Sequence, residues 1–333
     1  MENKSQSRWL VEASFMAAIT FILMMLTTTT MLDVIGAFIV PIPMTILYLR
    51  HGKKAAWLCA IASGILSALF YDPLWIVKSI ILYGAMGIAL GYCIKKEQSV
   101  AKTIGFLAII NGIGNIINYI LIFTVFSDIS FTQYLQQIVN VFHQSADMAS
   151  SMAGNSASMQ QVVELYKSVD INYLLMILPI IFIVSIIISA FFNFIIARWI
   201  LRKLGFKVKS LPPFSRWYLD SKISIVLIIL FLLSYIMKVN NIAYSNSFFV
   251  TMLCLLIVVF MIQSLSIVAY FLKNKLKLSN PIIIFIEFII IMSPLSLYFV
   301  ALGIADLIMD IRDVDPNSLK NIIKGNIKNK FKH

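Results

Sequence analysis

Charged side chains are scarce in this sequence, and their scarcity excludes an ordinary soluble domain. Asp, Glu, Lys and Arg make up 13% of the 333 residues, whereas hydrophobic residues make up 60% and the mean hydropathy is +0.90. A soluble domain carries about 25% charged residues. In a bilayer, backbone amides must bond within their own segment, and long apolar runs favour helices over the alternating strands of a barrel. The sequence therefore predicts an all-α, polytopic helical membrane bundle of about 8–10 transmembrane helices.

Residues suited to covalent, metal or nucleotide chemistry are also few. Each of the three cysteines, Cys59, Cys93 and Cys254, falls inside an apolar run, which fits neither a disulfide framework nor metal-ligand spacing. The sequence has no H-E-x-x-H pair, no G-x-x-x-x-G-K-[ST] phosphate loop and no G-x-S-x-G nucleophile elbow. We therefore expect no enzyme, no metal and no cofactor. If ATP powers this protein, another chain hydrolyses it.

The charges that are present are mostly positive, with 27 Lys and Arg against 15 Asp and Glu. In a polytopic membrane protein such a surplus lies in cytoplasmic loops, so it is poor support for binding nucleic acid. Basic clusters follow apolar runs at 50–54, 95–96, 202–216 and 273–277. Placing these clusters on the cytoplasmic side and counting the apolar runs between them predicts a multi-pass protein in contact with the lipid bilayer, with its N-terminus in the cytoplasm.

The apolar runs divide the chain into four parts. Residues 1–200 are expected to form a six-helix membrane region, with an extracytoplasmic insert at 127–172 that has few long apolar runs. A basic cytoplasmic linker follows at 201–220, with Pro212–Pro213 at its middle. Additional membrane helices occupy 221–312, and a basic cytoplasmic tail occupies 313–333.

The last apolar stretch, residues 281–304, has two possible topologies. A single crossing would place the Lys-rich tail outside, against the positive-inside rule. Two short helices broken at Ser293–Pro294 would return the tail to the inside, provided that the second helix extends to about Ile311. We favour the broken hairpin.

Amide side chains at membrane depth mark one set of candidate binding residues. Asn111, Asn115 and Asn118 recur at i, i+4 and i+7 and therefore share one helix face. Gly112 and Gly114 beside this face permit close approach of another backbone or of a ligand. The amides either form interhelical hydrogen bonds or line a polar pocket.

Three ionisable residues, Asp33, Asp72 and Lys78, map to the outer ends of their helices. Lys78 lies about one turn in, from where it can reach water or pair with Asp72, and snorkelling alone would also explain all three. Glu287 lies well inside a late helix, and we assign no role to it.

Short motifs at both ends of the chain carry a resemblance to a known family. The first are an Ala-x-x-x-Ala helix (Ala13, Ala17), Val40-Pro41-Ile42-Pro43 and Leu49-Arg50-His51-Gly52-Lys53-Lys54-Ala55-Ala56, and the last is Leu302-Gly303-Ile304-Ala305-Asp306 followed by Arg312. This pattern resembles the YybS-like family of uncharacterised bacterial membrane proteins. The resemblance implies a location in the bacterial cell membrane.

The first six helices are also distantly similar to the substrate-binding S components of energy-coupling-factor vitamin transporters. That similarity implies a docking face at Ala13 and Ala17 for a transmembrane coupling protein, energised by ATPase subunits, although close helix packing also explains small residues at this spacing. It further implies a ligand cavity toward the outer side. The residues already found there are Asp33, Asp72, Trp75, Lys78, Asn111, Asn115 and Asn118.

Two functions follow as expectations. The first is a non-enzymatic protein that captures a small, partly apolar molecule from the outer side and works with separate energising chains. The alternative is a membrane scaffold or regulatory protein that acts through its basic linker and tail, whose lysines also attract anionic lipid without any protein partner.

Overall fold

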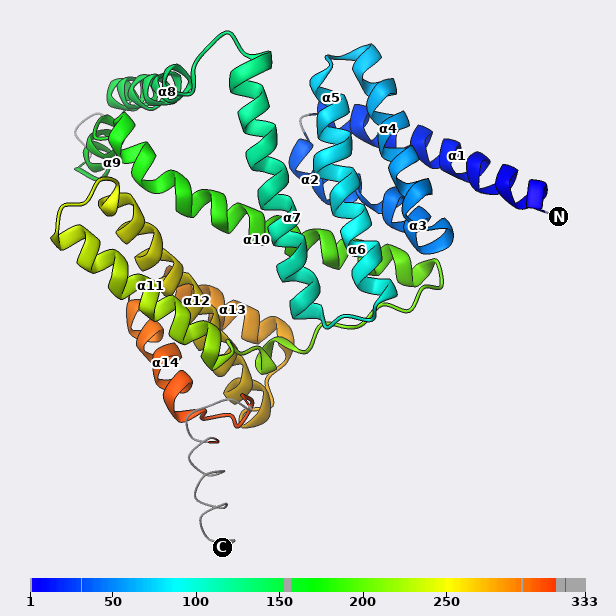
Figure 1. Cartoon of the computed structure of the whole chain (residues 1–333). Coiled ribbons are helices and arrows are strands. Elements are labelled where there is room, and N and C mark those ends of the chain that lie inside the picture. Colours follow the sequence, from blue (N-terminus) through cyan, green and yellow to red (C-terminus); the bar gives the residue numbers. More distant parts are fainter. Residues whose placement is uncertain (1, 31, 153–156, 295, 316–320, 322–333) are drawn as a thin grey trace, which may run out of the picture. The chain divides into compact units, whose positions relative to one another are not determined.

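The computed structural model describes residues 2–30, 32–152, 157–294, 296–315 and 321, with the side chains of all of these except 2–7, 33, 34, 152, 157 and 158. In this part of the chain every regular element is a helix (Figure 1). Seven spans are long and apolar enough to cross a membrane, or eight if a bent helix pair counts as one span. The predicted all-α membrane bundle is confirmed. The seven spans are Arg8–Thr29, Lys53–Phe70, Leu74–Lys95, Val100–Phe126, Ile171–Lys203, Ser221–Val239 and Ser245–Asn274.

The chain divides into two compact units. The first comprises residues 1–171 and 181–210, and the second comprises residues 172–180 and 211–333. The helices of the first unit are α1 (Glu2–Thr29), α2 (Asp33–Ile39), α3 (Ile42–His51), α4 (Lys53–Phe70), α5 (Leu74–Val77), η1 (Lys78–Gly84), α6 (Ala85–Lys95), α7 (Val100–Leu121), η2 (Ile122–Phe126), α8 (Phe131–Met152), α9 (Ala157–Lys167) and the part of α10 (Ile171–Lys203) from residue 181 onward.

Small residues bring α1 close to α3 and α4. Ala13 and Ala17 of α1 are buried in one cluster with Ala56 and Ala60 of α4. Helices in lipid gain little from the hydrophobic effect, so small side chains that let backbones approach provide much of the packing energy. These three helices therefore form one part of the core of the first unit.

The second apolar run of the sequence folds as two short helices, α2 and α3, neither of which is long enough to be a span. Pro41 lies at their junction and has no N–H with which to continue the helical hydrogen bonds. Asn193 of α10 donates from Nδ2 to the Phe38 carbonyl oxygen at 3.0 Å. Every residue from Ile42 to Leu47 is buried. This interruption of the helical hydrogen bonds thus lies inside protein, where a bilayer tolerates it.

The insert predicted between the fifth and sixth runs contains two helices, α8 and α9, which lie side by side (Figure 1). The rings of Phe142 and Tyr166 meet edge to face at 5.7 Å between centroids. Lys167 Nζ lies 3.3 Å from Asp147 Oδ1 at the exposed surface. The two helices therefore form a hairpin whose contacts include an aromatic pair and a solvated ion pair.

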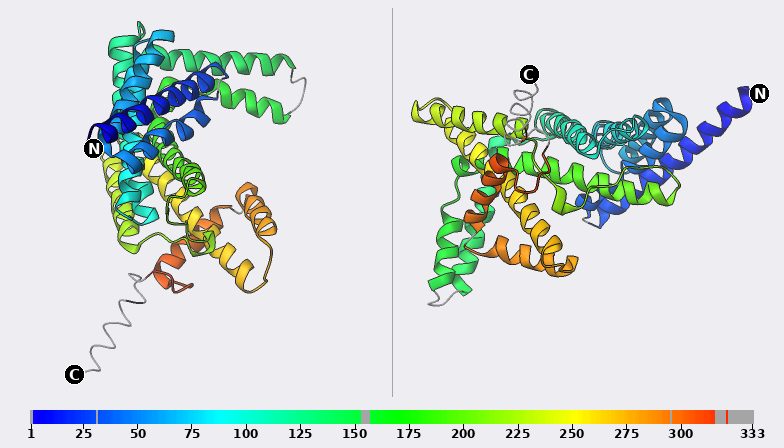
Figure 2. Two further views of the ribbon diagram at one scale, coloured as in Figure 1. Left: turned by 90° about the vertical axis from the view of Figure 1, so that its right-hand side faces the viewer. Right: turned by 90° about the horizontal axis from the view of Figure 1, so that it is seen from below.

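The second unit contains η3 (Phe214–Arg216), α11 (Ser221–Val239), α12 (Ser245–Asn274), α13 (Asn280–Met292) and α14 (Ser296–Met309), together with residues 172–180. The axes of α13 and α14 are bent by 112° from one another (Figure 2). Ser293 between them is extended, the conformation favoured before a proline, here Pro294. The helix break predicted at Ser293–Pro294 is confirmed.

After the break, α14 packs closely on α12. A Cβ atom added at Gly303 would lie 2.2 Å from the Phe260 carbonyl oxygen, so only glycine fits this crossing. Beyond α14, Arg312 Nη1 donates to the Ser215 carbonyl oxygen at 3.1 Å. Residues 211–220 and the first residues of the predicted tail thus lie at the same end of the second unit. Most of that tail, 316–320 and 322–333, lies outside the described residues.

Candidate functional site

A cavity of about 460 Å³ lies among the helices of the first unit, and we call it the amide cavity. Its volume falls within the range of about 300–1,000 Å³ that is usual for small-molecule sites. Most of its lining is apolar, with two amides and two serine hydroxyls as the exceptions. The lining residues are Ala37, Phe38, Pro41, Leu82, Tyr83, Met86, Asn111, Asn115, Ser185, Ile188 and Ser189.

The two amides come from α7, one turn apart. Asn115 Nδ2 donates to the Asn111 carbonyl oxygen at 2.8 Å and to Asn111 Oδ1 at 2.9 Å. Both side chains are half-buried. Within the described residues, Asn115 Oδ1 and the Asn111 side-chain N–H groups have no protein partner. The pair therefore presents both an acceptor and donors at membrane depth.

A π-helical segment forms another part of the wall. η1 interrupts the span Leu74–Lys95, and its residues Leu82 and Tyr83 line the amide cavity. A π-helical turn holds an extra residue and therefore moves side chains out of the 3.6-residue period, and such segments are frequent at functional sites. Gly114 of α7 allows the close approach, because a Cβ there would lie 3.1 Å from the Ile81 carbonyl oxygen.

The remaining polar groups come from α10. Ser185 and Ser189 lie four residues apart and so share one face of this helix. Ser185 Oγ donates to the Phe182 carbonyl oxygen at 2.8 Å, which leaves its lone pairs as acceptors. With the amides of α7, the amide cavity offers a few hydrogen-bonding groups in an otherwise apolar surface.

Asp72, Trp75 and Lys78, which were also predicted to bind a ligand, do not line the amide cavity. Lys78 Nζ stands 4.5 Å from the ring centroid of Trp75, a cation–π contact. Asp72 Oδ1 accepts from the Leu74 N–H at 2.8 Å, so this carboxylate stabilises the turn that precedes α5. No ion pair joins Asp72 to Lys78 in the described part of the chain.

Asn118 continues the predicted stripe but does not line the amide cavity. Its side chain is 5% exposed, and its Oδ1 has no hydrogen-bond partner among the described residues. The side chain of Asp33 lies outside the described residues. The structure therefore brings Asn111 and Asn115 together at a cavity and Trp75 and Lys78 together elsewhere in the unit.

The predicted docking residues, Ala13 and Ala17, are 1% and 2% exposed. Their methyl groups pack within the first unit against α3 and α4. The same helix presents larger apolar side chains, Val11 and Phe15, at its exposed surface. Docking at the two alanines stays a prediction, since in this structure they form an internal contact.

Sequence reasoning missed several lining residues of the amide cavity. Ser185 and Ser189 stand at helical spacing within the most apolar span, which is the signal that would have found them. Pro41 belongs to the Val40–Pro43 motif, but nothing in that motif indicates that this residue lines a cavity. Leu82 and Tyr83 carry no signal, because a π-helical segment leaves no mark in the hydrophobic pattern.

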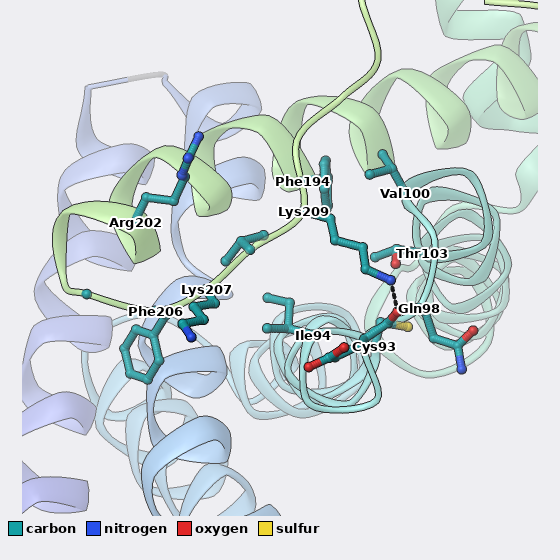
Figure 3. A pocket seen from close by; sticks show the side chains of 13 residues that line it. Cys93, Ile94, Gln98, Val100, Thr103, Phe194, Arg202, Phe206, Lys207 and Lys209 are labelled. Carbon is teal, nitrogen blue, oxygen red and sulfur yellow. Dashed lines mark hydrogen bonds between the residues drawn. The ribbon is translucent and has the colours of Figure 1, made fainter.

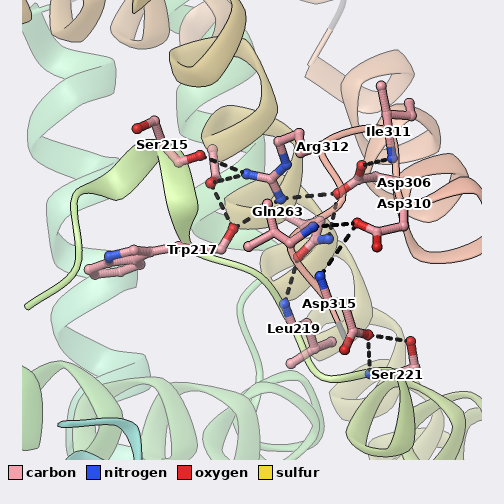
Figure 4. Close-up of polar contacts among 12 residues, drawn as sticks. Ser215, Trp217, Leu219, Ser221, Gln263, Asp306, Asp310, Ile311, Arg312 and Asp315 are labelled. Carbon is pink, nitrogen blue, oxygen red and sulfur yellow. Dashed lines mark hydrogen bonds and ion pairs between the residues drawn. The ribbon is translucent and has the colours of Figure 1, made fainter. Parts of the chain in front are cut away.

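A second polar cluster lies in the second unit around the buried side chain of Arg312, and we call it the Arg312 network (Figure 4). Arg312 Nη2 lies 3.0 Å from Asp306 Oδ2, with side-chain exposures of 0% and 3%. Arg312 also donates to Ser266 Oγ at 2.6 Å and to the Trp217 carbonyl oxygen at 3.0 Å. Gln263 Nε2 donates to the same Asp306 oxygen at 2.9 Å.

Further carboxylates surround the network. Asp315 Oδ2 accepts from the Ser221 N–H and hydroxyl at 3.1 and 2.5 Å, and Asp310 Oδ1 accepts from the Val314 N–H at 2.9 Å. Burial raises the pKa of Tyr218 in the nearby loop, and the charges of Asp315, Asp220 and Asp310 raise it further. These groups bind the 214–221 segment, α12 and residues 306–315 to one another, which is a structural role.

The fold and its two polar clusters define a polytopic α-helical membrane protein. Residues 18–307 match the profile of the family described as "Predicted membrane protein (DUF2232)". Because this match covers most of the chain, the protein belongs to that family. No curated protein matches the chain, and no solved structure matches it.

Proposed function

We propose that the protein is a non-enzymatic membrane protein that binds a small, largely apolar molecule in the amide cavity. The observation that carries the proposal is the pairing of Asn111 with Asn115, which leaves hydrogen-bonding groups facing a cavity inside the membrane spans. Polar groups at membrane depth are costly unless they pair or line a functional cavity. The π-helical wall and the Pro41 break support the same site.

Cysteine accessibility tests whether the amide cavity admits solutes. In a chain whose three cysteines are replaced by alanine, Ser189→Cys is compared with Ile116→Cys, whose native side chain is exposed on the outer surface of α7. A water-soluble methanethiosulfonate should modify the cavity cysteine at least tenfold faster, because a thiol facing lipid does not ionise. Equal rates at both positions would show that the cavity is closed to water-soluble reagents.

Ligand capture tests the binding itself. Small molecules that co-purify from native membranes are extracted and measured by mass spectrometry for the wild type, Asn115→Leu and the control Ile116→Leu. Occupancy should fall about tenfold in Asn115→Leu, since one hydrogen bond in an apolar site contributes about 1 kcal/mol and the unpaired Asn111 adds a further cost. The same bound molecules at the same occupancy in all three proteins would contradict the assignment of the amide cavity as the binding site.

The finer function rests on resemblance. The likeness to YybS-like proteins and to S components supports uptake of the bound molecule across a bacterial cell membrane, with the N-terminus in the cytoplasm and with a transmembrane coupling protein and ATPase subunits as partners. The same preparations are therefore searched for co-purifying proteins. Stoichiometric ATPase and coupling chains agree with transport, whereas a soluble regulatory protein bound to the basic linker or tail identifies a scaffold.

A further inference from the structure

A second cavity of the first unit, about 480 Å³ in volume, is lined by basic residues, and we call it the basic cavity (Figure 3). It lies where α6 ends, α7 begins and α10 runs into the segment 205–209. These are the ends of three membrane spans. The basic cavity therefore belongs to the boundary between the apolar spans and the loops. Its lining residues are Cys93, Ile94, Glu97, Gln98, Val100, Thr103, Phe194, Arg202, Gly205, Phe206, Lys207, Val208 and Lys209.

Two helix ends of the same design shape the basic cavity. At the end of α10, Gly205 has a φ of +86° and the Phe206 N–H donates to the Leu201 carbonyl oxygen at 3.0 Å. At the end of α6, Glu97 has a φ of +50° and the Gln98 N–H donates to the Cys93 carbonyl oxygen at 3.0 Å. Both are left-handed caps that turn the chain sharply. The cap at the end of α10 directs the segment 206–209 past the turn between α6 and α7.

The charge of the basic cavity is strongly unbalanced. Arg202, Lys207 and Lys209 line it, against the one acid Glu97. Lys95 at the end of α6, Lys96 directly after it and Lys102 in the first turn of α7 add further positive charge at this junction, outside the lining. Figure 3 shows Lys209 reaching the turn that follows α6, whereas Lys207 lies beside Phe206 and Arg202 extends away from the end of α10. An anion in the cavity would relieve this excess of positive charge.

Helix capping explains only part of this positive charge. Arg202 stands in the last turn of α10 and Lys209 Nζ donates to the Glu97 carbonyl oxygen, so both complement the negative end of a helix. Lys207 has no hydrogen bond or ion pair with any described residue. Val100 and Thr103 of the lining belong to the first turn of α7. The backbone N–H groups of this turn add partial positive charge to the basic cavity.

The lining also includes the apolar side chains Ile94, Phe194, Phe206 and Val208, beside the polar Gln98 and Thr103. A cavity lined by both cations and apolar side chains suits an amphiphile that carries a phosphate. Basic pockets between membrane helices at the charged boundary bind anionic lipid head groups. We propose that the basic cavity binds a phosphate group, held by Lys207 and Lys209, and that the phosphate belongs to an anionic phospholipid whose first acyl carbons contact the apolar lining residues.

The test is a lipid titration of the purified full-length protein in dodecylmaltoside, read by native mass spectrometry with phosphatidylglycerol and phosphatidylcholine as probes. The wild type is compared with Lys207→Gln/Lys209→Gln and with the control Lys53→Gln/Lys54→Gln, an exposed lysine pair of the same unit that does not line the cavity. Each lysine near anionic lipid contributes about a fivefold factor in affinity. Phosphatidylglycerol should therefore bind about thirtyfold more weakly to the first variant and within about twofold of wild type to the control.

A charge-conserving variant, Lys207→Arg/Lys209→Arg, guards against a loss caused by misfolding and should retain phosphatidylglycerol binding. Competition by inorganic phosphate and by glycerol 3-phosphate separates the two sources of the phosphate. No competition at millimolar concentrations supports the lipid, and competition that disappears in the glutamine variant supports a soluble phosphate at the same site. Equal phosphatidylglycerol binding by the wild type and the glutamine variant, or no preference over phosphatidylcholine, overturns the proposal.

Discussion

The Arg312 network allows one prediction to be worked out from its geometry. Arg312→Met removes the cation and keeps a long apolar side chain of similar reach. Asp306, 3% exposed at its side chain, then keeps the Gln263 amide at 2.9 Å and the Ile311 N–H at 3.0 Å but loses its counter-charge. Breaking a buried ion pair from one side costs about 3–5 kcal/mol, because the remaining charge is left uncompensated. We expect a loss in the free energy of unfolding of that size.

The double variant Asp306→Asn/Arg312→Met should be no less stable than Arg312→Met, since the carboxylate that Arg312→Met leaves without its counter-charge is then neutral as well. The coupling free energy between the two positions should then be about 2 kcal/mol or more. SDS titration of the full-length protein in mixed micelles measures unfolding, and Lys222→Met, which removes an exposed lysine at the start of α11, is the control. The reasoning is refuted if the losses of the two single variants simply add, or if Arg312→Met matches Lys222→Met.

Two further predictions concern the second unit and its loop. Gly303→Ala should destabilise the protein by about 1–3 kcal/mol, because the new Cβ would meet the backbone of Phe260 at 2.2 Å. The control Gly105→Ala, which has open space around the new Cβ, should be neutral or slightly stabilising. SDS titration measures both variants, and equal effects would contradict the close crossing of α12 and α14. Because the pKa of Tyr218 is raised in the folded state, its contribution to stability is present below the unfolded value of about 10 and is lost as pH rises through the folded value. Tyr218→Phe should therefore flatten the alkaline loss of stability and remove a phenolate absorbance step at 295 nm that lies above the ordinary tyrosine value, and an unchanged profile would argue against the shift.

Much of the fold follows from local features of the sequence. The length of the apolar runs predicts the membrane spans. The ends of these spans coincide with Gly52, with the basic turn after α6 and with the lysines at the end of α12. The break at Ser293–Pro294 could be predicted because proline restricts its neighbour and because the positive-inside rule disfavoured a single crossing. These are signals within a few residues, which a single sequence carries well.

The amide cavity was harder to predict, because its walls depend on contacts between distant segments. The periodicity of Asn111 and Asn115 indicated a polar face, but not that the stripe continues past the cavity to Asn118, about one turn further along α7. The hydrogen bond from Asn193 to Phe38 joins residues 155 positions apart. No local pattern encodes that distance, and the same holds for the partners of Arg312 in the 215–217 segment.

The short pair α2 and α3 has a consequence for how the chain enters the membrane. Taken together, residues 35–51 form 17 residues of apolar helix, about 25 Å long, which falls short of a hydrocarbon core of about 30 Å. Every residue from Ile42 to Leu47 is buried against protein. The Phe38 carbonyl oxygen accepts its hydrogen bond from Asn193, so this contact forms only after residue 193 has been synthesised. The segment therefore reaches its final packing only when helices that follow it in the sequence are in place.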